Sequence, residues 1–191
     1  MSAALAGCGS QSVSTTPVKL RPDQRPVRIG RGPGYELRAI SSAVAQRAQV
    51  NGLRCAATER GGAFGVHLEL FARRRVLIVP AGIGIAPPQH RRGTYVLGGS
   101  CSYPIRTVDP TGVIVVDRGT SAVLGTFFAV WGQPLSRSEL AGFRGTVVAF
   151  VGGRRWLADP AHIPMQRHSE IVLEVGGSLL PHPSYRFPPG L

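Results

Sequence analysis

The sequence predicts one α+β domain, rich in β-strands, over residues 35–191 of the 191-residue chain. Three observations predict this class. Residues 66–79 and 146–158 each read as a β-hairpin, and a short apolar helix lies between them. Two similar hairpins around a core helix are typical of a β-grasp-like sheet or a small sandwich. We expect an N-terminal helix to precede them.

The chain opens with a motif typical of bacterial lipoproteins. Leu5-Ala6-Gly7-Cys8 matches a lipobox, in which the cysteine is lipidated and becomes the new N-terminus. We therefore expect residues 1–8 to be a signal-peptide remnant with the lipid on Cys8. Residues 1–7 contain no Lys or Arg, whereas a secretory signal has a basic start and an apolar core of about 7–15 residues. Either the signal begins upstream of Met1, or the match arises by chance.

Residues 9–34 are rich in Ser, Thr, Pro and Arg and predict a disordered tether. Residues 35–50 predict a helix, with Asn51-Gly52 as its C-terminal stop. Apolar residues recur in this helix at three- and four-residue spacing: Leu37, Ile40, Val44 and Ala48.

In the first predicted hairpin, the aliphatic residues Val66, Leu68 and Leu70 alternate with His67, Glu69 and Phe71. Three arginines at 73–75 form a polar turn, and the β-branched run 76–79 returns as the second strand. Pro80 ends that strand, because proline has no N–H to donate to a ladder.

The middle of the domain predicts one strand and one helix. A turn at 109–112 leads into a strand at 113–116. The helix has an apolar face at positions i, i+3, i+4 and i+7, which is typical of a core-facing helix: Leu124, Phe127, Phe128 and Trp131.

The second predicted hairpin joins strands 146–151 and 154–158 through a Gly152-Gly153 turn, and residues 169–175 give a last strand. The tail, residues 176–191, is rich in proline and aromatic residues. We expect it to lie extended against the domain.

The formal charge of +12 comes from 22 basic and 10 acidic residues. Basic chains often bind nucleic acid, but the sequence has no zinc-finger spacing, helix-turn-helix or ribonucleoprotein strand. We therefore expect no nucleic-acid partner. An acidic cell-wall polymer, anionic lipid or an envelope protein suits a tethered cationic domain better.

Apart from Cys8, the chain contains two cysteines, Cys55 and Cys101. An even remainder in an exported protein predicts one disulfide between them. The alternative is a pair of buried free thiols in a cytosolic protein.

From about Cys55 onward, six segments resemble a group of uncharacterised exported proteins and lipoproteins of actinobacteria and related lineages: VHLELF (66–71), VPAGIGI (79–85), CSY (101–103), TVDPTGVI (107–114), FFAVWG (127–132) and FPPGL (187–191). The pattern of that group includes H-x-H-L near the first strand, and L-H-T-H-D followed by S-G-x-I-H near the third. The resemblance implies an imidazole cluster that suits Cu, Zn or another borderline metal.

This chain departs from the group's pattern at the cluster itself. His67 and Asp109 match it, but other residues stand at the remaining imidazole positions: Gly65, Arg106, Val108 and Val115. A metal site needs about three or four ligands, so we expect no metal and no cofactor there. Arg106 either binds an anion through its planar guanidinium or is a simple surface residue. Together, His67, Arg106 and Asp109 form a possible remnant of a ligand site.

The sequence predicts no catalytic residue. It contains no G-x-S-x-G elbow and no C-x-x-C motif, and its few acidic residues are scattered. The other histidines lack metal-ligand spacing and are expected to be solvated at the surface: His90, His162, His168 and His182.

These observations predict a non-enzymatic envelope lipoprotein on the outer face of the cytoplasmic membrane. The alternative is an exported protein that handles Cu or Zn, and a more distant one is an envelope hydrolase.

Overall fold

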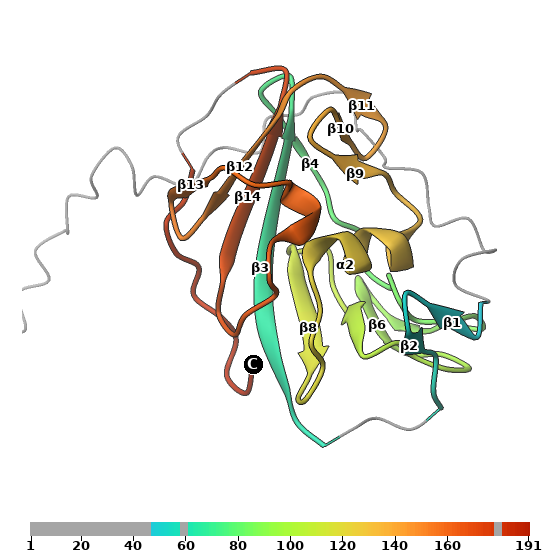
Figure 1. Cartoon of the computed structure of the whole chain (residues 1–191). Coiled ribbons are helices and arrows are strands. Elements are labelled where there is room, and N and C mark those ends of the chain that lie inside the picture. The colour runs from blue at the N-terminus through green and yellow to red at the C-terminus, as the bar shows by residue number, and fades with distance from the viewer. Residues whose placement is uncertain (1–46, 58–60, 178–180) are drawn as a thin grey trace, which may run out of the picture.

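The structure, a computed structural model, describes residues 47–57, 61–177 and 181–191. They form a β-rich domain with several sheets and one short α-helix, compatible with a small β-sandwich (Figure 1). The predicted lipobox, the tether and residues 35–46 of the predicted N-terminal helix lie outside the described residues. No helix in the described part of the chain has the length and apolar character needed to span a membrane.

The largest sheet has seven strands in the order β13-β12-β14-β3-β8-β7, with β4 paired to β3. Strands β14 and β3 run parallel, and the other neighbours are antiparallel. The strands are β3 (Ala63–Ala72), β4 (Arg75–Leu77), β7 (Ile105–Thr107), β8 (Val113–Asp117), β12 (Val147–Val151), β13 (Arg154–Trp156) and β14 (Glu170–Val175).

Both predicted hairpins are confirmed. Strand β3 turns into β4 through Arg73-Arg74, and β12 turns into β13 through Gly152-Gly153. All four loop residues have positive φ, between 50° and 74°. Two-residue loops with this backbone conformation match the twist of the antiparallel strands that they join. This explains why the chain reverses direction so tightly in both hairpins.

The end of the predicted N-terminal helix is wrong. Strands β1 (Gln49–Val50) and β2 (Leu53–Arg54) form a small antiparallel hairpin, with Val50 opposite Leu53. Asn51 and Gly52 form its loop, with φ of 46° and 81°. An Asn-Gly pair is also the strongest short hairpin signal, since both residues tolerate positive φ. Here the pair makes a hairpin rather than ending a helix.

The predicted core helix is confirmed as α2 (Leu124–Trp131), and its four predicted core residues are at most 1 % exposed. Gly132 ends it with a φ of 75°. Helix α2 belongs to the same core as alternate residues of the large sheet, which define the helix face: Val66, Leu68, Leu70, Ile114, Val116, Ile171 and Leu173. Burial of these side chains stabilises the fold through the hydrophobic effect.

Smaller elements surround this core, and the sequence analysis missed them. They are the hairpin β5 (His90–Arg92) and β6 (Tyr95–Gly98), the meander β9 (Leu135–Ser136), β10 (Glu139–Leu140) and β11 (Phe143–Arg144), and the 3₁₀ helix η2 (Pro160–His162). Strand β7 was also missed, because its three residues are too few to show a periodic pattern.

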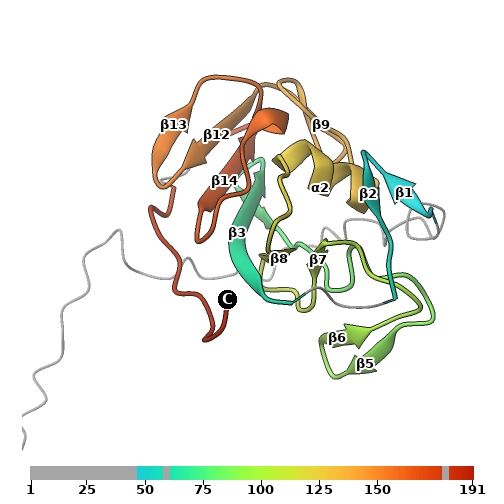
Figure 2. The same ribbon diagram turned by 60° about the horizontal axis from the view of Figure 1, so that its bottom comes forward.

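Helix α2 and the C-terminal tail lie on either side of strand β3 (Figure 2). Residues 181–191 have no regular secondary structure and pack on the sheet, as predicted for the tail. We call the sheet surface beneath this segment the tail face. It consists of the residues that alternate with those of the helix face.

Candidate functional site

The tail face gathers buried charged side chains. Five such residues of the described chain lie at alternating positions of the sheet that point away from α2: His67, Arg106, Asp117, Glu170 and Glu174. Burying a charge is costly unless it has a partner. We therefore expect a ligand-binding site on this face of the sheet.

His67 and Glu170 form the centre of this face. Parallel pairing of β3 with β14 sets them side by side, and His67 Nδ1 lies 2.8 and 3.0 Å from the two carboxylate oxygens. Their side chains are only 6 % and 1 % exposed. Burial raises the pKa of Glu170, and the hydrogen bond and charge of His67 oppose that rise.

The second ring nitrogen of His67 fixes its tautomer. Nε2 lies 2.9 Å from the carbonyl oxygen of Thr111, which can only accept, so Nε2 carries a hydrogen and donates it. Nδ1 then faces the Glu170 carboxylate and shares one proton with it. A cation could take the place of that proton.

Asp109 supports this arrangement from the neighbouring loop. Its Oδ1 accepts a hydrogen bond of 3.0 Å from the Thr111 backbone N–H and another from the Thr111 hydroxyl. Asp109 thus shapes the turn that presents the Thr111 carbonyl to His67. Thr111 therefore connects Asp109 with His67, both of which the sequence analysis proposed as site residues.

The C-terminal tail covers the pair. The Tyr185 ring stacks on the His67 ring, with centroids 3.7 Å apart and planes 10° from parallel. Phe187 packs edge-on against Tyr185 and lies over Gly65, where an added Cβ would come 2.6 Å from the ring. His168 stacks on Phe187 and hydrogen bonds to the backbone oxygen of Leu191 at 2.7 Å.

A second imidazole–carboxylate pair lies beside the first. His182, in the tail, places Nδ1 2.8 Å from both oxygens of Glu69, with side chains 30 % and 20 % exposed. His182 is therefore partly exposed and paired with a carboxylate, which corrects the prediction that it is simply solvated at the surface. Within the described residues, the possible ligand atoms of His67, Glu69 and Glu170 lie within 4.8 Å of one another.

Sequence reasoning missed Glu69, Glu170 and His182 as site residues. The only local signal was His67-x-Glu69, which places both side chains on one face of a strand. Glu170 is 103 positions from His67 and reaches it only through the pairing of β14 with β3.

Arg106 is buried, which corrects the expectation that it is a simple surface residue. It is 7 % exposed, and its Nη1 lies 2.7 Å from Asp117 Oδ1 on the neighbouring strand. Nη1 also lies 3.4 Å from the backbone oxygen of Tyr103. The guanidinium thus neutralises a buried carboxylate.

Three of the positions at which the sequence resemblance implies histidines lie in one row across the sheet. Gly65 pairs with Val115, and Val115 pairs with Arg106. The row lies beside His67 on the tail face, so the structure brings together positions that the sequence separates by up to 50 residues.

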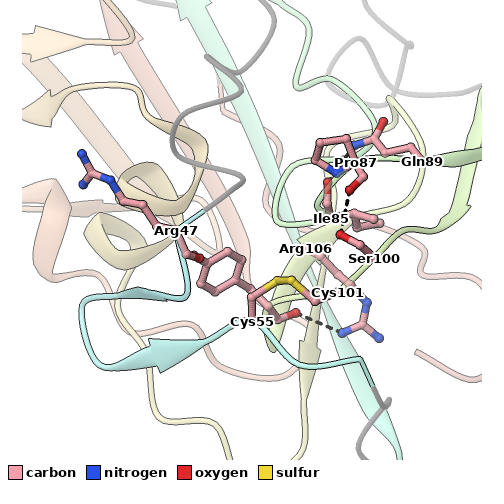
Figure 3. Close-up of a disulfide and its surroundings, with 9 residues drawn as sticks. Arg47, Cys55, Ile85, Pro87, Gln89, Ser100, Cys101 and Arg106 are labelled. Carbon is pink, nitrogen blue, oxygen red and sulfur yellow. Dashed lines mark hydrogen bonds between the residues drawn. A yellow bond between two sulfur atoms is a disulfide. The ribbon is translucent and has the colours of Figure 1, made fainter.

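The predicted disulfide is confirmed. Cys55 and Cys101 are bonded, with Cα atoms 5.4 Å apart and a sequence separation of 46 (Figure 3). The Arg106 side chain lies next to the bond in that view. Cys8 lies outside the described residues. His90, His162 and His168 are exposed, as predicted.

A cavity of about 460 Å³ adjoins the two pairs. His67, Glu69, Thr111 and His182 contribute to its lining, together with apolar residues of β3 and β4. The polar cluster is therefore reachable by a small ligand from one side. Comparison of the chain with known protein families, curated proteins and solved structures gives no significant match.

Proposed function

We propose that this protein is a non-enzymatic binding module of the bacterial cell envelope, exported and held on the outer face of the cytoplasmic membrane by lipid on Cys8. The observation that carries the proposal is the Cys55–Cys101 disulfide. Structural disulfides persist in oxidising compartments and are rare in the bacterial cytoplasm. A lipobox followed by a polar tether fits the same compartment.

The contacts of the histidines favour binding over catalysis. His67 and His182 face carboxylates, and His168 faces a backbone carbonyl. A nucleophilic mechanism instead needs an imidazole beside a serine, threonine or cysteine that it can activate. Imidazole and carboxylate groups packed together are suited to holding a cation or a proton.

The basic surface supports an anionic envelope partner. Exposed arginines occur on three hairpins: Arg73 and Arg74, Arg91 and Arg92, and Arg154 and Arg155. A cationic module tethered close to a membrane gains about 1 kcal/mol for each basic residue near an anionic surface. We therefore infer that the domain rests against acidic lipid or wall polymer.

Anchoring is tested by expressing the gene from its native locus, with its upstream DNA, in cells fed radiolabelled palmitate. We expect the label in the membrane-bound protein and none in the Cys8→Ser variant. Thiol alkylation without reductant should leave Cys55 and Cys101 unmodified in the same sample. A protein that stays in the cytoplasm with two free thiols would overturn the proposal.

The second candidate function is metal handling outside the cytoplasm. It is favoured by one observation, the convergence of His67, Glu69 and Glu170 within 4.8 Å. Metal analysis of protein isolated from its native envelope tests it. Zinc or copper in stoichiometric amount, lost on His67→Ala, would support this function, and a metal-free native protein would exclude it.

A further inference from the structure

We propose that His67, Glu69, Glu170 and His182 bind one divalent transition ion of the zinc type, in a site that the C-terminal tail closes. The inference rests on the metal-handling function above and names its ligands. It differs from the imidazole cluster of the resembled proteins, because three of these four residues are not among that cluster's positions.

The separations of the first three ligand atoms suit one ion. Zinc bonds to imidazole nitrogen and carboxylate oxygen are about 2.0–2.2 Å long, so two ligand atoms are at most about 4.4 Å apart. The possible ligand atoms of His67, Glu69 and Glu170 lie within 4.8 Å of one another. Small side-chain rotations would bring them around one ion without moving a strand.

His182 supplies the fourth ligand from the tail. Its Nδ1 is already 2.8 Å from both oxygens of Glu69. An ion bound by Glu69 would therefore meet an imidazole nitrogen on the side facing the tail. Two nitrogens and two carboxylates complete the four-coordinate set that zinc prefers.

The surroundings of His67 resemble those of a metal-binding imidazole. Ligand histidines usually donate their other N–H to a carbonyl or carboxylate, which fixes the ring and its tautomer. His67 Nε2 donates to the Thr111 carbonyl at 2.9 Å, and the Tyr185 ring stacks on its face. Nδ1 thereby faces the Glu170 carboxylate, and a divalent ion would take the place of the proton that these two groups share.

Charge also favours a cation. Two carboxylates lie close together here, and the Glu170 side chain is 1 % exposed. One doubly charged ion would neutralise both and remove the cost of burying them. The adjoining cavity of about 460 Å³, which His67, Glu69 and His182 help to line, gives the ion a path from solvent.

The donor set indicates the class of metal. Imidazole nitrogens select borderline ions such as Zn²⁺, Co²⁺ or Ni²⁺ over Mg²⁺ and Ca²⁺, which prefer oxygen ligands. The four residues offer no thiolate or thioether, the ligands that select Cu(I).

The site is tested on the full chain carrying Cys8→Ser, so that its free thiol adds no ligand. After dialysis against a chelator, Zn²⁺ alone is titrated by calorimetry, and Co²⁺ is titrated by visible absorption. We expect one equivalent of either ion to bind. Glu69→Gln and His182→Ala should each weaken binding by about tenfold or more, whereas the matched control His162→Ala should not change it.

Partly exposed positions keep the test informative, because His67→Ala or Glu170→Gln could unfold the core. Glu69 and His182 lie at the edge of the cluster, so their variants should stay folded by circular dichroism. Absence of binding to the folded chain, or binding unchanged by both edge variants, would overturn the site. Zinc binding in vitro by a protein that is metal-free in its native envelope would overturn the function and keep the site.

Limited proteolysis tests whether the C-terminal tail closes the site. Trypsin cleaves after the exposed Arg186 and releases the segment 187–191, which mass spectrometry can follow. Zn²⁺ should slow this cleavage several-fold in the parent protein and leave it unchanged in His182→Ala. Equal cleavage rates with and without Zn²⁺ in the parent protein would overturn the closing role of the tail.

Discussion

The Glu170 carboxylate lies 2.8 Å from His67 Nδ1, on the neighbouring parallel strand, and both side chains are buried. This hydrogen-bonded pair joins the last strand of the sheet to its central strand. The tail that follows then folds back over the same pair through Tyr185. The chemistry of the site and the closure of the fold therefore depend on the same two residues.

Replacing His67 by Ala in metal-free protein should destabilise the fold by about 3–5 kcal/mol, because Glu170 would stay buried without its partner. Urea denaturation measures this change. The double variant His67→Leu, Glu170→Leu removes both polar groups and should lose less stability than His67→Ala alone. If the double variant loses as much stability as the single variants His67→Leu and Glu170→Leu lose in sum, this account of the pair would be contradicted.

Removing the disulfide should also destabilise the protein. The bond between Cys55 and Cys101 closes a loop with a sequence separation of 46. A bridge over a loop of this size stabilises a fold by about 2–4 kcal/mol, in part by restricting the unfolded chain. We expect the double variant Cys55→Ser, Cys101→Ser to lose this amount in thermal or urea unfolding. Cys8→Ser serves as the control and should change nothing.

The elements that the sequence predicted correctly are those with strong local patterns. The alternation in β3, the helical spacing of Leu124 and Phe128, and the Gly152-Gly153 turn each specify their structure within a few residues. The disulfide followed from a count of cysteines. The prediction that Asn51-Gly52 ends a helix was wrong, because the same pair of residues suits both a helix end and a hairpin turn.

The candidate site was harder to predict, because it depends on strand neighbours that are distant in sequence. His67 meets Glu170 only where β14 pairs in parallel with β3, and such long-range pairing has no local signature. Arg106 looked like one arginine among many, since its burial follows from the pairing of β7 with β8, next to Asp117. Composition alone could not separate it from the arginines of the hairpins.

One glycine should be indispensable where the chain passes close to strand β7. Gly84 has a φ of 74°, and an added Cβ would lie 2.4 Å from the backbone oxygen of Ile105. Gly84→Ala should therefore cost several kcal/mol or prevent folding. Gly93 has a φ of 60° but open space around it, so Gly93→Ala should cost only about 1 kcal/mol. Equal losses for the two variants in thermal unfolding would contradict the proposed contact with Ile105.

Alkaline pH should destabilise the fold through Tyr103. This side chain is 1 % exposed, and its hydroxyl donates to the backbone oxygen of Arg47. Burial raises the pKa of Tyr103 above 10.0, and the charge of Arg47 opposes the rise. The folded state therefore keeps a proton that the unfolded state has already released. Its stability is full below pH 10.0 and falls as the pH rises through the raised pKa.

Tyr103→Phe tests this dependence. The variant should lose about 1 kcal/mol at neutral pH, since a buried hydrogen bond disappears, and it should show a smaller further loss above pH 10.0 than the parent. Tyr95, which is 50 % exposed, provides the matched control Tyr95→Phe. Urea midpoints followed by tryptophan fluorescence, on the Cys8→Ser background that prevents thiol exchange, measure both effects. An alkaline loss that is the same in Tyr103→Phe and the parent would assign it to another group.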